Sequence, residues 1–319
     1  MKSKKEYILA GIVIIALIAY LMLHKTDQTH YEVPSIPTLT ESDITSISIT
    51  KSDKTIQLKK KDDQWMIVPE KYPTDKNKIE SMVDIITSLK ITALVSESTT
   101  YLRYELDPEN RISIQAGSGD KIMRTFDIGK AAPSNRHTFI KFPKDKRVYH
   151  AQENFRSKFD QTKDDLRDKT VLTIERSEVR QVEIKDKDGN MVLSMKQVPV
   201  EVKVTPDAEQ QEEKTAPFNN IASDELVWQD EDGNPVKESD INNLFNNVSA
   251  LKCKSYIADK TRADFTEPMY TVTLTGAKTY TLSVFEKLNE DDDTYPAISS
   301  ENDYSFMLPA YKMDNMVKK

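Results

Sequence analysis

The sequence predicts an α+β protein, in which an N-terminal transmembrane helix precedes two tandem copies of one α/β module with mostly antiparallel or mixed sheets. Three observations predict this fold class. An uncharged run follows a lysine cluster, two amphipathic helix patterns resemble each other, and strands of alternating polarity flank both helices. The expected organisation is 1–24 for the lysines and membrane helix, 25–43 for an extended stalk, 44–175 for the first module and 176–319 for the second.

The N-terminal run from Tyr7 to Leu23 contains no charged residue and is about as long as the shortest helices that span a bilayer. Lys2, Lys4 and Lys5 precede it, and positively charged flanks remain on the cytoplasmic side. We therefore expect a single-pass anchor in the cytoplasmic (inner) membrane, with the rest of the chain on the outer face. A cleaved signal peptide is the alternative, but large side chains occupy the positions expected for a cleavage site.

Two helix patterns indicate that the module is duplicated. The segments 77–89 (NKIESMVDIITSL) and 239–251 (SDINNLFNNVSAL) carry apolar residues at the same helical positions. The only two tryptophans, Trp65 and Trp228, precede these helices at almost the same distance. Matched spacing at so long a period favours two copies of one unit over a solenoid, which needs shorter and more numerous repeats.

The segments around the helices also correspond. Asn77 and Ser239 both suit a helix N-cap, because their side chains accept hydrogen bonds from free backbone N–H groups. Residues 44–58 and 179–193 both have the alternating pattern of a β-hairpin around a polar turn. We therefore expect each module to begin with a hairpin and to continue through a helix into further strands.

A repeated short sequence raises the question of calcium binding. KDKDGN ends at Asn190 and QDEDGN ends at Asn234, and aspartates on a tight loop are typical of calcium sites. Neither segment has the later glutamate or the flanking helices of a calcium hand. An Asp-Gly pair between alternating residues is a strong hairpin signal, so Asp186 and Asp230 are predicted to lie in structural turns.

No catalytic, cofactor-binding or metal-binding residue is predicted, and no cofactor is expected. Cys253 aligns with Ile91 of the first module, which favours a small buried side chain over a nucleophile. The histidines lack the spacing of metal ligands; they are His24, His30, His137 and His150. With 52 acidic and 45 basic side chains, the chain has no general electrostatic attraction for nucleic acid.

Four segments have unusual composition. Residues 130–147 are basic and are expected to form a solvated strand pair, with binding to lipid head groups or an anionic polymer as the alternative. The acidic run 290–295 is expected to be a solvated loop. Polar residues 199–223 are expected to be an insertion that forms a mobile excursion or an extended hairpin loop, and 152–172 to form a charged helix before the second module.

The ordered set of Trp65-x-Ile67, YELDP, FDIG and LRDKTVL behind one membrane helix resembles the bacterial domain-of-unknown-function 4340 family. The similarity covers about Thr45 to Leu172 well and the second module more loosely. In the YELDP segment the family usually has glycine at the place of Glu105, so that turn is expected to differ. The resemblance implies a membrane-anchored extracytoplasmic protein associated with ABC-type export systems of the gliding-motility kind, and it implies no catalytic residue.

Two function classes follow from these observations. The first is a noncatalytic accessory or binding protein beside a membrane transporter, with an ABC permease as the expected partner and binding in loops or between the modules. The second is a cell-envelope hydrolase with an unrecognised acidic pair, for which Glu97 and Asp127 are arbitrary candidates. The specific partner or ligand, the oligomeric state and the choice between a periplasm and a Gram-positive surface stay open.

Overall fold

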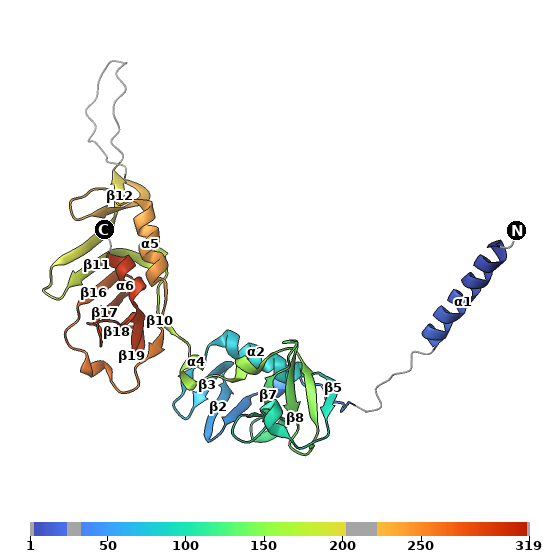
Figure 1. Ribbon diagram of the computed structural model, residues 1–319. Helices are drawn as coiled ribbons and strands as arrows, with labels where there is room; N and C mark the ends of the chain where they lie inside the picture. Colours follow the sequence, from blue (N-terminus) through green and yellow to red (C-terminus); the bar gives the residue numbers. More distant parts are fainter. Residues whose placement is uncertain (1–2, 24–32, 202–221, 318–319) are drawn as a thin grey trace, which may run out of the picture. The chain divides into compact units, whose positions relative to one another are not determined.

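The computed structural model describes residues 3–23, 33–201 and 222–317 (Figure 1). The chain divides into a first unit of residues 1–71 and 76–161, and a second unit of residues 72–75 and 162–319. The sequence places the boundary after residue 175. In the structure β10 (Thr170–Thr173) pairs with β14 (Ala250–Lys252), and these hydrogen bonds make β10 a part of the second unit.

The N-terminal apolar run forms the helix α1 (Ser3–Leu23). Several of its aliphatic side chains are exposed, including Ile12, Ile15 and Leu17 at 59%, 69% and 55%. Among the helices within the described part of the chain, none has both the length and the apolar content needed to cross a membrane.

The first unit is a mixed α+β domain with an antiparallel sheet. The strands within it are ordered β3-β2-β1-β6-β7-β8-β9-β5. Its strands are β1 (Ser46–Lys51), β2 (Lys54–Lys61), β3 (Gln64–Val68), β5 (Ile91–Ser96), β6 (Ile112–Ser118), β7 (Lys121–Ala131), β8 (His137–Lys141) and β9 (Val148–Gln152). Its helices are η1 (Glu41–Asp43), α2 (Lys76–Ser88), η2 (Tyr101–Tyr104) and α3 (Arg156–Phe159).

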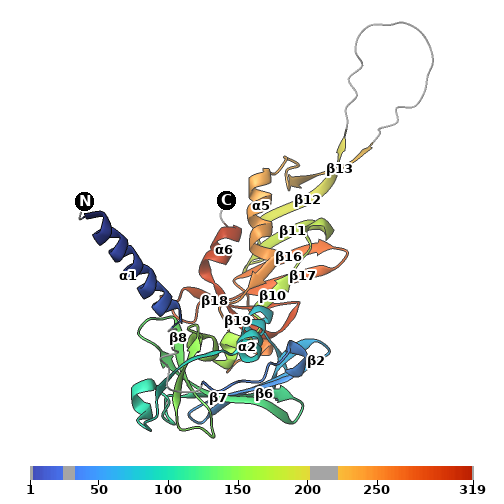
Figure 2. The same ribbon diagram turned by 90° about the vertical axis from the view of Figure 1, so that its right-hand side faces the viewer.

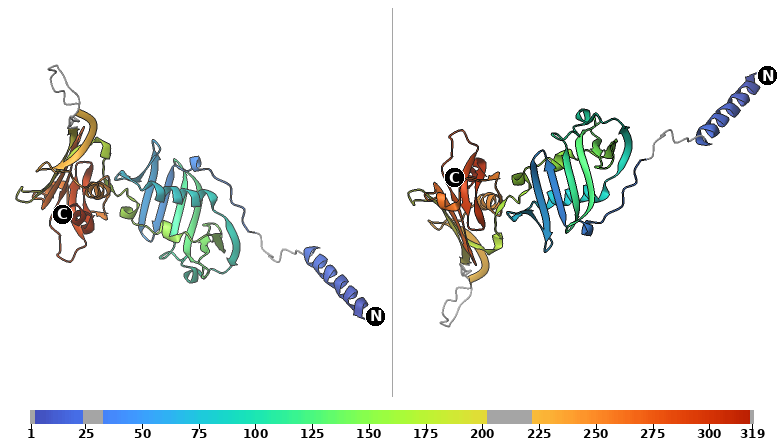
Figure 3. Two further views of the ribbon diagram at one scale, coloured as in Figure 1. Left: turned by 90° about the horizontal axis from the view of Figure 1, so that it is seen from above. Right: turned by 90° about the horizontal axis from the view of Figure 1, so that it is seen from below.

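Helix α2 supplies much of the core of the first unit. Figure 3 shows it lying across one face of the blue-to-green sheet. The buried face of α2 includes Ile79, Met82 and Ile86, which recur at helical spacing as the sequence predicts. Residues Ile47 and Ile49 of β1 alternate with less buried neighbours, so one face of this strand is buried.

The second unit has an eight-stranded antiparallel sheet and a separate two-stranded sheet of β10 and β14. The larger sheet has the order β13-β12-β11-β16-β17-β18-β19-β15. Its strands are β11 (Val179–Asp186), β12 (Met191–Glu201), β13 (Ala222–Asp230), β15 (Ser255–Tyr256), β16 (Tyr270–Gly276), β17 (Thr279–Val284), β18 (Thr294–Ser299) and β19 (Asn302–Pro309). The remaining elements are β4 (Tyr72–Pro73), α4 (Lys163–Leu166), η3 (Arg176–Glu178), α5 (Glu238–Val248), η4 (Arg262–Asp264) and α6 (Ala310–Val317).

The two sheets share one connectivity. β1, β2 and β3 occupy the same positions in the first sheet as β11, β12 and β13 in the second, and β5 and β15 both lie at the opposite edge. A helix follows the third strand in each unit, namely α2 and α5. In the second unit α5 and α6 pack against each other, as Figure 2 shows.

Both predicted hairpins are present. β1 pairs with β2 from Ser46 opposite Lys59 to Lys51 opposite Lys54, and β11 pairs with β12 around the KDKDGN turn. The predicted N-caps are wrong: α5 begins at Glu238 after Lys237, and α2 begins at Lys76. Each helix starts one residue before its predicted N-cap, so Asn77 and Ser239 lie inside the first turn.

The predicted charged helix over 152–172 is also wrong. The segment forms β9's last residue, two four-residue helices, α3 and α4, and the strand β10. Phe155, Phe159 and Leu166 are buried, and Thr162 starts a new helix by accepting a hydrogen bond from the Asp165 N–H at 3.1 Å. Burial of these apolar side chains and this cap interrupt the helix that the charge pattern suggests.

The stalk and the insertion are described only in part. Of the stalk, residues 24–32 lie outside the described residues. Residues 33–40 have no helix or strand, and the Pro37 carbonyl accepts a hydrogen bond from Arg124 on β7. Of the insertion, 202–221 lies outside the described residues. Its two ends continue as the paired strands β12 and β13.

Candidate functional site

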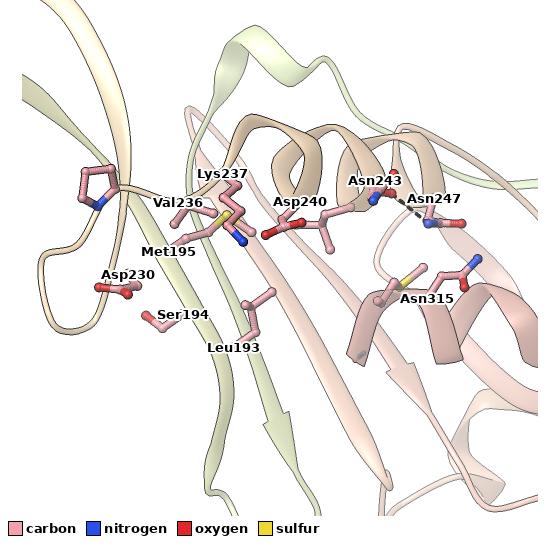
Figure 4. A pocket seen from close by; sticks show the side chains of 13 residues that line it. Leu193, Ser194, Met195, Asp230, Val236, Lys237, Asp240, Asn243, Asn247 and Asn315 are labelled. Atoms are coloured by element: carbon pink, nitrogen blue, oxygen red, sulfur yellow. Dashed lines mark hydrogen bonds between the residues drawn. The ribbon is translucent and has the colours of Figure 1, made fainter. Parts of the chain in front are cut away.

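A groove with a volume of about 640 Å³ lies in the second unit, between β12, α5 and α6 (Figure 4). Its floor is apolar and comprises Leu193, Met195, Val236, Leu244 and Met316, and the exposed Pro235 completes the apolar lining. Polar side chains surround the floor, namely Ser194, Asp230, Lys237, Asp240, Asn243, Asn247 and Asn315. Met195, Leu244 and Met316 are buried, whereas Asn243 and Asn315 are exposed, so the groove has an apolar base and a polar rim.

The amphipathic pattern of α5 produces this division. Ile241, Phe245 and Val248 are buried in the core of the second unit. Asn243 and Asn247 lie four residues apart, and such residues project from the same side of a helix. The polar edge of α5 therefore lines the groove while its apolar face packs on the sheet.

The chemistry of the lining suits binding. A carboxamide offers donors and an acceptor together, so Asn243, Asn247 and Asn315 match a ligand that presents both. The lining residues include no histidine, cysteine, arginine or aromatic side chain. Of the two carboxylates, that of Asp230 already accepts hydrogen bonds from the backbone N–H and the side-chain amide of Asn234, at 2.8 and 3.3 Å.

The model of one protein family matches residues 65–269 of the chain, and this family is described as a domain of unknown function (DUF4340). The chain belongs to this family. The match begins at Trp65 and continues well into the second unit, beyond the part that the sequence motifs cover best. No curated protein and no solved structure matches the chain.

The LRDKTVL motif of this DUF4340 chain forms a contact inside the second unit. The guanidinium of Arg167 lies 3.5 Å from the ring centroid of Tyr256, 3.8 Å from that of Tyr72 and 4.7 Å from that of Tyr304. The Asp168 N–H donates to the Pro73 carbonyl at 2.9 Å. Stacking on aromatic rings favours arginine over lysine at this position, so the motif has a packing role.

In the YELDP motif, Glu105 occupies the position where the family usually has glycine. Glu105 has a φ of 54°, in the left-handed region that glycine favours, and it ends η2. Its carboxylate lies 3.5 Å from the guanidinium of Arg156. The turn therefore has a backbone conformation that suits glycine.

The two Asp-Gly segments form turns, as predicted. Asp186 accepts hydrogen bonds from the backbone N–H groups of Asp188 and Asn190 at 2.9 and 2.8 Å, and Gly189 has a φ of 82°. Hydrogen bonds from Asn190, the side-chain amide first, hold the pKa of Asp186 below its ordinary value. In both turns the aspartate closest to the strand uses its oxygens to order the backbone.

Asp127 and Glu97, the arbitrary candidates for an acidic pair, have separate surroundings. Asp127 on β7 is buried and lies 3.0 Å from the Lys141 ammonium. Its other oxygen accepts a hydrogen bond from the Ser113 hydroxyl at 2.7 Å. Glu97 follows β5 and contributes to raising the pKa of Arg147, for which hydrogen bonding to Asp145 is the main cause. Neither residue lines the groove.

The basic segment 130–147 contributes to β7 and β8, and two of its six cationic side chains have carboxylate partners. Lys141 pairs with Asp127, and Arg147 pairs with Asp145 at 2.9 Å. The carboxylate of Asp145 also accepts a hydrogen bond from the Tyr149 hydroxyl at 2.6 Å. The Arg147 guanidinium first, and then this hydroxyl, hold the pKa of Asp145 far below its usual range. The segment thus forms strands, and part of its charge is neutralised internally.

Residues 290–293 of the acidic run lie between β17 and β18, and its last two residues, Thr294 and Tyr295, begin β18. Asp293 lies 2.7 Å from the Lys254 ammonium, and this hydrogen bond is the main reason that the pKa of Asp293 is lowered. Asp292 accepts a hydrogen bond from the Asn289 N–H at 3.2 Å. The loop is therefore exposed and locally paired.

His137 and His150 form a pair that the sequence spacing does not reveal. They lie on the adjacent strands β8 and β9, and their rings stack with centroids 5.2 Å apart. Burial, followed by the charge of His137, lowers the pKa of His150. Within the described residues, no group of three or more His, Cys, Asp or Glu side chains is arranged for a metal ion.

The His150 environment predicts a pH dependence of stability. A histidine with a lowered folded-state pKa binds fewer protons in the folded state than in the unfolded state. The stability that comes from keeping His150 neutral is therefore complete above the ordinary pKa of 6.5. It is lost as the pH falls from there through the folded-state pKa of His150. We expect the urea midpoint to fall between pH 7 and pH 5 less steeply in His150→Gln than in the unchanged chain. Equal slopes would contradict this expectation.

Cys253 lies in the core of the second unit, as predicted, and is a buried free thiol. Burial raises the pKa of this thiol to about 11. Thiolate is the reactive form, so at pH 8 we expect the folded chain to react with a disulfide reagent at least 100-fold more slowly than glutathione. The same chain in guanidinium chloride serves as the control and should react fully. Rapid stoichiometric reaction in the folded state would contradict the assignment.

Proposed function

We propose that this chain is a noncatalytic accessory protein that binds a partner through the groove of the second unit. The observation that carries the proposal is the lining itself: three carboxamides and a serine surround an apolar floor. Such a site provides hydrogen bonds and apolar contact, which are the requirements for recognition. The sequence suggests a binding site in loops or between the modules, whereas the site proposed here is the groove of the second unit.

The proposal includes a single-pass membrane anchor in the uncharged N-terminal run from Tyr7 to Leu23. Two observations support it: the helix exposes aliphatic side chains, and Lys2, Lys4 and Lys5 occur at its N-terminal side. With the lysines in the cytoplasm, both units lie on the outer face of the bacterial cytoplasmic membrane. The association with an ABC-type transport system of the gliding-motility kind rests on the family resemblance alone.

We also propose that the two units arose by duplication of one module. The correspondence of strand order supports this, because each strand from β1 to β3 and from β5 to β9 has a counterpart at the same sheet position. The equivalent helices α2 and α5 and the positions of Trp65 on β3 and Trp228 on β13 add to it. The groove lies in the second copy, which carries α6.

Isolation from bacterial membranes tests the proposed function. Carbonate treatment should leave the full chain in the membrane pellet, whereas a version with residues 1–24 replaced by a cleavable signal peptide should be released. Purification in a mild detergent should yield a permease or an ATPase in stoichiometric amount. Absence of such a partner, together with turnover of cell-wall glycans, would favour the alternative of an envelope hydrolase with an acidic site.

A further inference from the structure

We infer that the groove of the second unit binds an extended peptide segment of a partner protein. This inference rests on the proposed binding function and specifies the chemical class of the ligand. It follows from three properties of the lining: the spacing of the carboxamides, the nature of the floor and the balance of charge.

The spacing of the carboxamides matches an extended backbone. Asn243 and Asn247 are four residues apart on α5, which corresponds to about 6 Å along a helix axis. The N–H and C=O groups of alternate residues face the same edge of an extended chain, so they repeat every two residues, or about 6.6 Å. Two asparagines on one helix edge therefore match two alternate residues of the peptide, each of which offers one N–H donor and one C=O acceptor on that edge.

The polar groups needed for this recognition are available in part without a ligand. Among the described residues, the side-chain carboxamides of Asn243 and Asn315 make no hydrogen bond. The side-chain amide of Asn247 donates to the backbone carbonyl of Asn243 at 2.8 Å, as Figure 4 shows. That bond uses one donor of the Asn247 amide, which has a second N–H and a carbonyl oxygen.

The floor favours a peptide over a sugar. Leu193, Met195, Leu244 and Met316 provide aliphatic and thioether surface, and methionine adapts to side chains of different shape. Sugar rings commonly stack on aromatic side chains, and the lining has none. Two carboxylates, Asp230 and Asp240, oppose the single ammonium of Lys237, so a neutral or basic segment is favoured over an acidic one.

The test uses the full chain in detergent and a random decapeptide library displayed on phage. The most enriched sequence is then synthesised with a fluorescent label, and its Kd is measured by fluorescence anisotropy. We expect the double substitution Asn243→Ala and Asn247→Ala to raise the Kd at least 10-fold. Asn246→Ala is the matched control, because Asn246 is an exposed residue of α5 that does not line the groove, and it should leave the Kd unchanged.

A separate experiment tests whether the groove contacts the backbone of the peptide. N-methylation of the peptide at alternate residues should weaken binding strongly in one of the two registers and little in the other, because one edge of the extended chain contacts the asparagines. If the double variant melts at a lower temperature by circular dichroism, Asn315→Ala on α6 provides the second test. It should raise the Kd without a shift in melting.

Three outcomes would overturn the inference: no peptide enriched above background, binding unaffected by the double variant and by Asn315→Ala, or displacement by linear N-acetylglucosamine oligomers with no peptide binding. None of these results alters membrane extraction or co-purification. The ligand class and the proposed function therefore fail by separate measurements.

Discussion

Replacing Asp127 with asparagine should lower the free energy of unfolding by about 3–5 kcal/mol, because the change leaves a buried ammonium without its counter-ion. The side chains of Asp127 and Lys141 are only 7% and 9% exposed, and their charged atoms lie 3.0 Å apart. Arg111, which lies 3.4 Å from the same carboxylate, is 36% exposed and keeps access to solvent. Lys141 therefore accounts for most of the expected loss.

Urea unfolding of the first unit measures this effect, and two variants make the result specific. Asp120→Asn, at an exposed position in the turn between β6 and β7, should change stability by less than about 0.5 kcal/mol. The double variant Asp127→Asn with Lys141→Met should recover a large part of the loss, since it removes the buried charge. If Asp127→Asn is as stable as the unchanged chain, the ion pair has no structural role.

Replacing Arg124 with methionine should lower the free energy of unfolding by about 3 kcal/mol, because three carbonyl groups lose a charged donor. The guanidinium of Arg124 is buried and donates to the carbonyls of Ile86 and Thr87 in the last turn of α2, and to that of Pro37. A cation at this end of a helix also interacts favourably with the helix dipole. Burial lowers the pKa of this arginine.

Limited proteolysis provides a second readout for Arg124. Loss of the bond to Pro37 should speed cleavage in residues 33–40, which precede η1 and have no helix or strand. Arg103→Met, at an exposed position in η2, is the matched control and should leave both stability and cleavage unchanged. Slow cleavage together with wild-type stability in Arg124→Met would refute the assigned role.

Local sequence signals predicted the elements that depend on periodicity and turn chemistry. The helices α2 and α5 follow from apolar residues at helical spacing, and the Asp186 and Asp230 turns follow from Asp-Gly pairs. The wrong prediction of a helix over 152–172 also rests on a local pattern. The charge density and the few apolar residues of this segment are typical of a helix, but burial of Phe155 and Phe159 decides its conformation.

The groove had no local signal because its lining comes from distant parts of the chain. Leu193 on β12 and Asn315 on α6 meet only after β12 joins the sheet and α6 packs on α5. The stacked His137 and His150 were missed for a similar reason, since their contact depends on the register of β8 and β9. Strand register is fixed by pairing across the sheet, which a linear pattern does not record.

The sequence by itself determined the family, the apolar N-terminal run, the positions of both long helices in the two units and the structural nature of the Asp-Gly turns. Each of these depends on residues within a few turns or strands of one another. The tertiary structure alone decided that Asp127 is buried against Lys141, that Arg124 binds Pro37 and that three asparagines surround one groove. The reason is physical: burial and hydrogen bonding between distant segments are settled by packing of the whole unit.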